Sequence, residues 1–212
     1  MHLPWRFIYR TPQVLSPSTY RPHSMVDEFM TPTQLIPALI LATTSAFASG
    51  QTPAPLKPIA QLEVSRYLGR WHEVAKFPNW FQKRCVSDTS ADYALQPDGS
   101  ISVLNQCRRA DGQWENALGQ AQQIGGTNSA TLKVRFAPAW LSFLPFVWGD
   151  YWIVDLDEAY ELAAVSEPQR DYLWILSRTP KPDPARYEAL VARLKAMGLE
   201  TERLEMTPSS GH

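Results

Sequence analysis

Short apolar runs that alternate with polar residues recur along the chain between about residue 70 and residue 178. Alternation with a period of two predicts half-buried β-strands. Eight such runs occupy residues 71–77, 86–95, 100–107, 114–123, 130–136, 150–156, 160–166 and 172–178. Turn residues such as Gly99 and Gly112 separate several of them. The pattern predicts an all-β fold, an eight-stranded antiparallel up-and-down β-barrel, because closure removes both unpaired edges.

The period changes to that of a helix after the last strand. Five apolar residues at helical spacing form one stripe: Tyr187, Leu190, Val191, Leu194 and Met197. Asp183 is placed to cap this helix, Pro184 suits its first turn, and Gly198 follows its end. We expect one C-terminal α-helix over 183–197, packed on the outside of the barrel through this stripe.

The N-terminal region is not expected to belong to the barrel. Residues 35–48 form an apolar segment that ends in Ala46-Phe47-Ala48, a pattern typical of a signal peptide cleaved after Ala48. The alternative is a buried helix that contains Pro37. The expected organisation is a leader over 1–48, a Pro-rich arm over 49–62, a folded domain over 63–206 with its barrel over 70–180, and a tail over 207–212.

Composition places the chain among globular proteins with one domain. Its 212 residues are 44% hydrophobic and carry a formal net charge of −1. This length suits a single domain with a full core. The near-neutral charge lacks the basic surface that nucleic-acid binding requires, so no nucleic-acid partner is expected.

Both cysteines lie in the part of the chain that follows the leader. Cys85 and Cys107 flank a predicted hairpin whose turn contains Pro97-Asp98-Gly99. Simple register places Cys107 opposite about residue 88, so a disulfide between the two requires a bulge in the first strand. A bridge that closes a loop of this size would stabilise the fold by about 3 kcal/mol. The alternative is two unpaired buried thiols.

Three short motifs appear in order along the predicted strands. The segment "GRWHEVAKF" contains Gly69 and Trp71, "VDLDEAYELAAV" contains Asp157 and Tyr160, and "YLWILSRTP" contains Arg178. On these motifs the chain resembles the lipocalins, and among them the branch of bacterial outer-membrane lipoproteins that bind lipids. The resemblance covers roughly residues 62–206. It implies a calyx, a barrel closed at one end and open at the other.

Up-and-down order brings all three motifs to the same end of such a barrel. Arg178 is then expected to lie over the ring of Trp71 as a cation–π pair that closes the base. Gly69, Asp157 and Tyr160 are expected to serve the same structural closure. We therefore expect no binding site at this end.

The expected lining of the calyx follows from the parity of each strand. It consists of Glu73, Ala75, Phe77, Ala91, Tyr93, Val103, Leu132, Val134 and Phe136. This set is apolar apart from Glu73 and the Tyr93 hydroxyl. The Glu73 carboxylate is expected either to accept a hydrogen bond from a ligand or to pair with Arg178, since a buried carboxylate needs a partner.

Apolar side chains also gather in two segments predicted at the open mouth. They are Trp80, Phe81, Trp140, Phe143, Phe146 and Trp148. The longer segment, 137–149, is expected to form a lid, to contact a membrane surface, to form a homodimer surface, or simply to pack locally. Four basic residues near the same mouth either meet a phosphate or carboxylate or are ordinary surface charges: Lys83, Arg84, Arg108 and Arg109.

Histidine usage argues against an enzyme. Only His72 and His212 follow the leader, and His72 lies on the outward parity of its strand. No catalytic triad can form around it, and the sequence has no two-histidine or Cys-x-x-Cys metal pattern. The prediction is a binding protein with no metal and no cofactor.

The expected ligand follows from the resemblance and from the apolar lining. The resemblance implies storage or transport of fatty acids or lysophospholipids in the bacterial cell envelope. Residue 49 is Ser and not Cys, so a lipid-modified N-terminus is not predicted, and a periplasmic or outer-membrane-associated protein is expected. One alternative is a binder of a tetrapyrrole, a carotenoid or another small hydrophobic molecule. The other is a lipocalin-type enzyme in which Glu73 and Asp92 act as acids.

Overall fold

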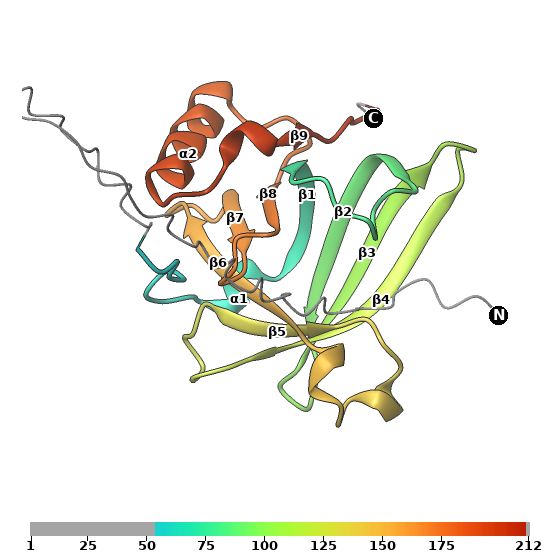
Figure 1. Cartoon of the computed structure of the whole chain (residues 1–212). Helices are drawn as coiled ribbons and strands as arrows, with labels where there is room; N and C mark the ends of the chain where they lie inside the picture. Colours follow the sequence, from blue (N-terminus) through green and yellow to red (C-terminus); the bar gives the residue numbers. More distant parts are fainter. Residues whose placement is uncertain (1–53, 211–212) are drawn as a thin grey trace, which may run out of the picture. The chain divides into compact units, whose positions relative to one another are not determined.

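The structure is a computed structural model, and it describes residues 54–210 (Figure 1). The expected leader, residues 1–48, lies outside the described residues, as does the first part of the expected Pro-rich arm. Within the described part, no helix is long and apolar enough to cross a membrane.

Eight strands in residues 54–210 form one closed antiparallel sheet (Figure 1). They are β1 (Gly69–Lys76), β2 (Cys85–Leu95), β3 (Ile101–Arg109), β4 (Trp114–Gln123), β5 (Thr131–Arg135), β6 (Gly149–Leu156), β7 (Leu162–Ser166) and β8 (Leu173–Ser177). Each strand pairs with the next, and β1 pairs with both β2 and β8, which closes the barrel. A short strand, β9 (Glu205–Met206), adds to β1 beyond its pairing with β2. The predicted up-and-down barrel is confirmed.

One cluster of buried side chains fills the inside of this barrel, and we call it the interior cluster. All eight strands contribute to it, and the short helix α1 (Val64–Tyr67) supplies Tyr67. Its members are Leu62, Tyr67, Trp71, Ala91, Tyr93, Ile101, Val103, Ala121, Ala130, Leu132, Ile153, Ala163, Val165 and Leu176. A cluster drawn from every strand lies on the concave face, because successive side chains of a strand point to opposite faces.

A second cluster, the outer cluster, lies between the barrel and helix α2 (Pro184–Ala196). It consists of Leu56, Val74, Ala75, Phe77, Val154, Leu162, Ala164, Leu173, Ile175, Leu190, Leu194 and Leu199. Strand β7 contributes to both clusters, which explains why four of its five residues are buried; the fifth, Ser166, is buried with its hydroxyl donating to the Tyr172 carbonyl at 2.7 Å. The Asp183 side chain caps α2 by accepting a hydrogen bond from the Arg186 amide at 2.9 Å. The expected external helix is confirmed.

A bulge in β1 changes the face of the sheet to which the side chains after Glu73 point. The pairing of β1 with β8 shifts between Glu73 and Ala75, so that Glu73 stands opposite Leu176 and Ala75 stands opposite Ile175. Leu176 belongs to the interior cluster and Ile175 to the outer one. The expectation that Ala75 and Phe77 line the calyx is therefore wrong, because one extra residue moves both side chains to the helix-covered face.

Segments on either side of the barrel are tied to it by backbone hydrogen bonds. In the N-terminal arm, the Ile59 amide donates to the Ile153 carbonyl, and the Leu62 amide to the Asn128 carbonyl, both at 2.8 Å. At the C-terminal end, the Thr207 amide donates to the Val74 carbonyl at 2.8 Å. Three short 3-10 helices complete the described chain: η1 (Ala139–Leu141), η2 (Pro145–Val147) and η3 (Thr201–Arg203).

Candidate ligand-binding site

Arg178 closes one end of the barrel. Its guanidinium carbon lies 4.0 Å from the centre of the Trp71 ring, the arrangement expected from the sequence. Its Nη1 donates to the Arg70 carbonyl at 2.8 Å, its Nη2 to the Arg66 carbonyl at 2.7 Å, and its Nε to the Tyr160 carbonyl at 3.1 Å. One side chain thus joins the three segments that carry the sequence motifs. We call this end of the barrel the base.

The other motif residues shape the backbone around Arg178. Gly69 has a φ of +88°, which a residue with a Cβ rarely adopts, and an added Cβ would lie 3.5 Å from Arg178 Nη1. The Asp157 carboxylate accepts hydrogen bonds from the amides of Glu161 and Leu162, at 2.7 and 3.1 Å. These contacts hold the turn between β6 and β7, from which the Tyr160 carbonyl meets Arg178.

The inner wall contains most of the residues that the sequence assigned to the calyx. Ala91, Tyr93, Val103 and Leu132 belong to the interior cluster, and Val134 and Phe136 pack against it. Alanines occupy several other positions of this wall, among them Ala121 and Ala163. A barrel of eight strands is filled by its own side chains or holds one small ligand, and short side chains take up less of that interior.

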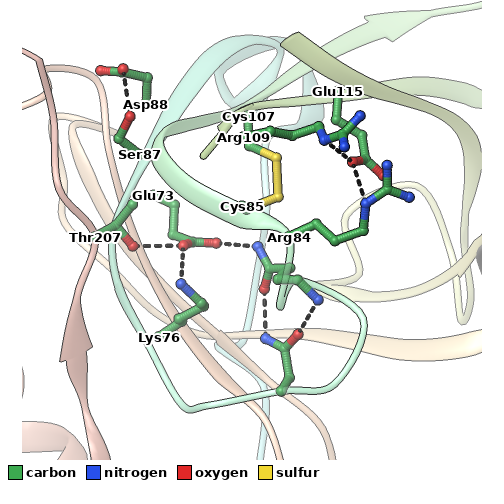
Figure 2. Close-up of a disulfide and its surroundings, with 12 residues drawn as sticks. Glu73, Lys76, Arg84, Cys85, Ser87, Asp88, Cys107, Arg109, Glu115 and Thr207 are labelled. Atoms are coloured by element: carbon green, nitrogen blue, oxygen red, sulfur yellow. Dashed lines mark hydrogen bonds and ion pairs between the residues drawn. A yellow bond between two sulfur atoms is a disulfide. The ribbon is translucent and has the colours of Figure 1, made fainter. Parts of the chain in front are cut away.

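Glu73 is held by partners other than the two expected ones. Its side chain is 4% exposed and accepts hydrogen bonds from Lys76 Nζ at 3.1 Å, Gln82 Nε2 at 2.6 Å and Thr207 Oγ1 at 2.6 Å (Figure 2). Arg178 is not among these partners. The expected pairing with Arg178 is therefore wrong, because the motif arginine is fully engaged with backbone carbonyls at the base while a loop and the C-terminal segment reach Glu73.

Three tyrosines meet inside the barrel. The Tyr151 hydroxyl lies 2.8 Å from the Tyr67 hydroxyl and 2.8 Å from the Tyr93 hydroxyl. Burial raises the pKa of Tyr93 to about 12 and raises the pKa values of Tyr67 and Tyr151 well above their ordinary value. All three therefore remain protonated at neutral pH. We call these residues the tyrosine cluster.

The lining expected from the sequence contains Tyr93 but neither of the other two members of this cluster. Tyr67 comes from α1, and a helix of four residues is too short for helical periodicity to predict it. Tyr151 lies on β6 opposite Leu132, a residue assigned to the calyx. That pairing follows from the order of the strands. Because Leu132 of β5 was expected to face inward, the residue opposite it on β6, Tyr151, could have been expected to face inward too.

The opposite end of the barrel is the mouth. Alternation of strand direction brings to it the connections 78–84, 110–113, 137–148 and 167–172. Phe81 of the first connection lies 5.6 Å from Tyr172 and 6.2 Å from Trp174, measured between ring centres. Gln82 accepts a hydrogen bond from Trp174 Nε1 at 3.0 Å. The first connection is therefore packed against the start of β8.

The connection over 137–148 presents its aromatic rings to solvent. Trp140 is 72% exposed, Phe143 76% and Phe146 52%. Trp148 differs, since its Nε1 donates to the Ser142 carbonyl at 2.8 Å and its ring lies 5.2 Å from the Arg135 guanidinium. The exposed rings Trp140, Phe143 and Phe146 form what we call the aromatic patch. More than half of the surface of each of these residues is exposed.

The basic residues near the mouth are mostly paired within the protein. Arg84 and Arg109 both approach the Glu115 carboxylate, at 3.2 and 3.7 Å. Arg108 lies 3.6 Å from the Asp88 carboxylate. Lys83 is exposed. The arrangement favours ordinary surface charge over the expected phosphate site for the three arginines.

A disulfide joins Cys85 to Cys107 near this end, with their Cα atoms 5.5 Å apart (Figure 2). The pairing of β2 with β3 shifts twice, between Cys85 and Ser87 and between Ser87 and Ser90. These irregularities move Cys85 into reach of Cys107. The predicted disulfide is confirmed, as is the bulge that it requires.

Titratable groups in residues 54–210 form no cluster of three or more His, Cys, Asp or Glu side chains suited to a metal ion. His72 is half-buried, and burial together with the nearby Arg70 charge lowers its pKa. It stands opposite Ser177 in the pairing of β1 with β8, one residue away from the inward-facing Trp71. His72 therefore lies on the outward parity of β1, as the sequence indicates.

Comparison with known families agrees with this geometry. A family model described as a lipocalin-like domain matches residues 62–209, which include the whole barrel and α2. The chain belongs to the lipocalin family. Members of this family are in general binding proteins for small hydrophobic ligands and not enzymes, which fits a closed barrel with an apolar inner wall.

Similar lipocalins come from plants, bacteria and animals. The chain is 39% identical to temperature-induced lipocalin-1 of Arabidopsis thaliana, over 73% of this chain and 83% of the plant protein. It is 37% identical to outer membrane lipoprotein Blc of Vibrio cholerae, over 79% of this chain and 95% of the bacterial protein. Among solved structures, insecticyanin of the tobacco hornworm Manduca sexta matches with a TM-score of 0.57 at 18% identity, over 74% of this chain and 85% of that one. This last likeness concerns the fold alone.

Proposed function

We propose that this lipocalin carries a fatty acid, a lysophospholipid or a similar amphiphile in the bacterial cell envelope. Its likeness to bacterial proteins named outer membrane lipoproteins supports the envelope as the location. Storage or transport, without chemical conversion of the ligand, is the proposed activity.

The observation that carries this proposal is the character of the inner wall. Val134, Phe136, Tyr151 and Trp174 pack against the interior cluster and yet are only partly buried. Side chains that face inward and keep part of their surface exposed leave apolar area for a ligand to cover. Each methylene group of an acyl chain that becomes buried there contributes about 0.8 kcal/mol.

Native mass spectrometry of the protein, purified without detergent and then delipidated, tests this proposal. We expect an adduct with the mass of a fatty acid or lysophospholipid that disappears on delipidation and returns on titration with the same lipid. A protein that takes up none of these lipids after delipidation contradicts the proposal. Lysozyme treated in parallel controls for nonspecific adducts.

The aromatic patch supports contact with a membrane surface, from which such a ligand would be taken or to which it would be delivered. Exposed aromatic rings are favoured at the interface between lipid and water. We expect the variant Trp140→Ser/Phe143→Ser to partition about tenfold more weakly onto vesicles of phosphatidylethanolamine and phosphatidylglycerol. Co-sedimentation with these vesicles measures the partition coefficient.

Leu118→Ser is the matched control for this experiment. Leu118 is 71% exposed and lies on β4, outside the aromatic patch, so its replacement removes an exposed apolar side chain from another part of the surface. We expect the control variant to partition like the wild type. Equal co-sedimentation of the patch variant and the wild type excludes the membrane contact. Loss of a dimer in sedimentation velocity assigns the patch to a second copy of the chain.

A further inference from the structure

The three hydroxyl groups of the tyrosine cluster have one more proton than the hydrogen bonds among them require. Three hydroxyl groups share two hydrogen bonds, one between Tyr151 and Tyr67 and one between Tyr151 and Tyr93. Each hydrogen bond uses one proton, whichever group donates it. One O–H donor is therefore left without an acceptor among the hydrogen bonds of the described residues. A buried donor without an acceptor is costly, so its presence calls for a partner.

The surroundings of this donor are apolar and belong to the inner wall. Tyr67 and Tyr93 are buried in the interior cluster, while Tyr151 packs against it and is only partly buried. Tyr67 contacts the Trp71 ring with 4.9 Å between ring centres, which places the cluster above the plug at the base. The cluster is thus a polar point inside a hydrophobic barrel, close to the plug at the base.

The charge of the partner follows from what surrounds the cluster. Within residues 54–210, no charged side chain hydrogen bonds to the three hydroxyls; the charge of Arg178 acts on Tyr67 only through space and lowers its pKa less than burial raises it. The guanidinium of Arg178 lies below Trp71 and donates to three backbone carbonyls. A carboxylate buried here would give up its hydration for a single neutral donor, which is unfavourable. An uncharged oxygen loses much less hydration free energy when it is buried.

We propose that the tyrosine cluster is a subsite for an uncharged hydrogen-bond acceptor at the buried end of the ligand. The class of ligand is a long hydrophobic molecule with a terminal ketone, ester or un-ionised carboxyl oxygen. Such a ligand enters with its oxygen first and leaves its hydrocarbon part toward the mouth. This inference rests on the proposed function and narrows it, because the charged headgroup of a lysophospholipid does not fit this subsite.

The test uses a matched pair of probes that differ only in the acceptor. 2-Dodecanone has the ketone oxygen, and 2-methyl-1-dodecene has a methylene group in its place. Quenching or enhancement of tryptophan fluorescence measures the Kd of each probe. We expect the wild type to bind the ketone about tenfold more tightly than the alkene, the difference that one buried hydrogen bond produces.

The variant for this test removes all three hydroxyls: Tyr67→Phe/Tyr93→Phe/Tyr151→Phe. Removal of a single hydroxyl is uninformative, because any smaller set still has a spare proton. Replacement of all partners by apolar groups of the same shape is nearly neutral for stability. We expect the triple variant to bind the ketone about tenfold more weakly than the wild type and the alkene with unchanged affinity. Tyr187→Phe on α2 is the control and is expected to change neither affinity.

Each other outcome overturns the proposal in a distinguishable way. Equal binding of ketone and alkene by the wild type overturns the subsite and leaves the proposed function intact. An equal loss of affinity for both probes in the triple variant would show that the tyrosines contribute through packing alone, and it overturns the subsite as well. Binding of neither probe by the wild type overturns the subsite, while the proposed function is decided separately by the uptake of fatty acid or lysophospholipid in native mass spectrometry. Infrared spectroscopy gives a second measurement, since the carbonyl stretch of bound ketone must move to lower wavenumber in the wild type only.

Discussion

The variant Arg178→Ala will unfold with a free energy about 4 kcal/mol lower than that of the wild type. Three backbone carbonyls lose a charged donor in this variant, and the Trp71 ring loses the guanidinium that lies 4.0 Å from its centre. Hydrogen bonds to charged groups are the stronger ones, and the cation–π contact with Trp71 adds to them. Urea unfolding monitored by tryptophan fluorescence measures the difference.

Arg186→Ala is the matched control for this experiment. Arg186 also lies beside the turn between β6 and β7, where it forms ion pairs with Asp157 and Glu161. Because water screens the ion pairs of this exposed side chain, we expect Arg186→Ala to lose much less stability than Arg178→Ala. Arg178→Lys retains the charge but not the planar fork of donors, so it should recover only a minor part of the stability. Equal losses for Arg178→Ala and Arg186→Ala would contradict the central role of Arg178.

The barrel itself was predictable because alternation is a local property. Each strand was located within two residues at either end, since a half-buried strand must alternate and turn residues mark where it stops. The external helix was predictable for the same reason, from the spacing of its apolar stripe and from Asp183 and Gly198 at its ends. The pairing of the strands then followed, because each strand of a meander pairs with the strands that precede and follow it in the sequence.

The inner wall was predictable only where no bulge intervened. Ala91, Tyr93, Val103 and Leu132 lie inside as parity indicates. Ala75 and Phe77 do not, because the pairing of β1 shifts after Glu73 and every later side chain changes face. Nothing in the sequence of β1 marks that shift. It becomes visible only through its partners on β8.

The partners of polar side chains were the least predictable feature. Glu73 binds Thr207, which is separated from it by 134 positions in the sequence. The tyrosine cluster likewise joins α1, β2 and β6. Such contacts depend on where a closed barrel brings distant segments together, and no local pattern encodes them. Arg178 was the exception, because its motif and the strand order both directed it to the base.

The disulfide should contribute the second large share of stability. The double variant Cys85→Ala/Cys107→Ala is expected to unfold with a free energy about 3 kcal/mol lower than that of the wild type. The bridge closes a loop with a sequence separation of 22, and the unfolded chain without it gains the entropy of that loop. Urea unfolding under oxidising conditions measures the loss.

Reduction of the wild type provides the control for the two substitutions. Wild type in excess dithiothreitol should lose about as much stability as the double variant, while the double variant should not respond to the reductant. The bridge lies near the mouth and Arg178 at the base, so its loss should leave the cation–π contact with Trp71 in place. A double variant that equals the oxidised wild type would show that the bulged start of β2 is already fixed by its other contacts, among them the ion pair of Arg84 with Glu115.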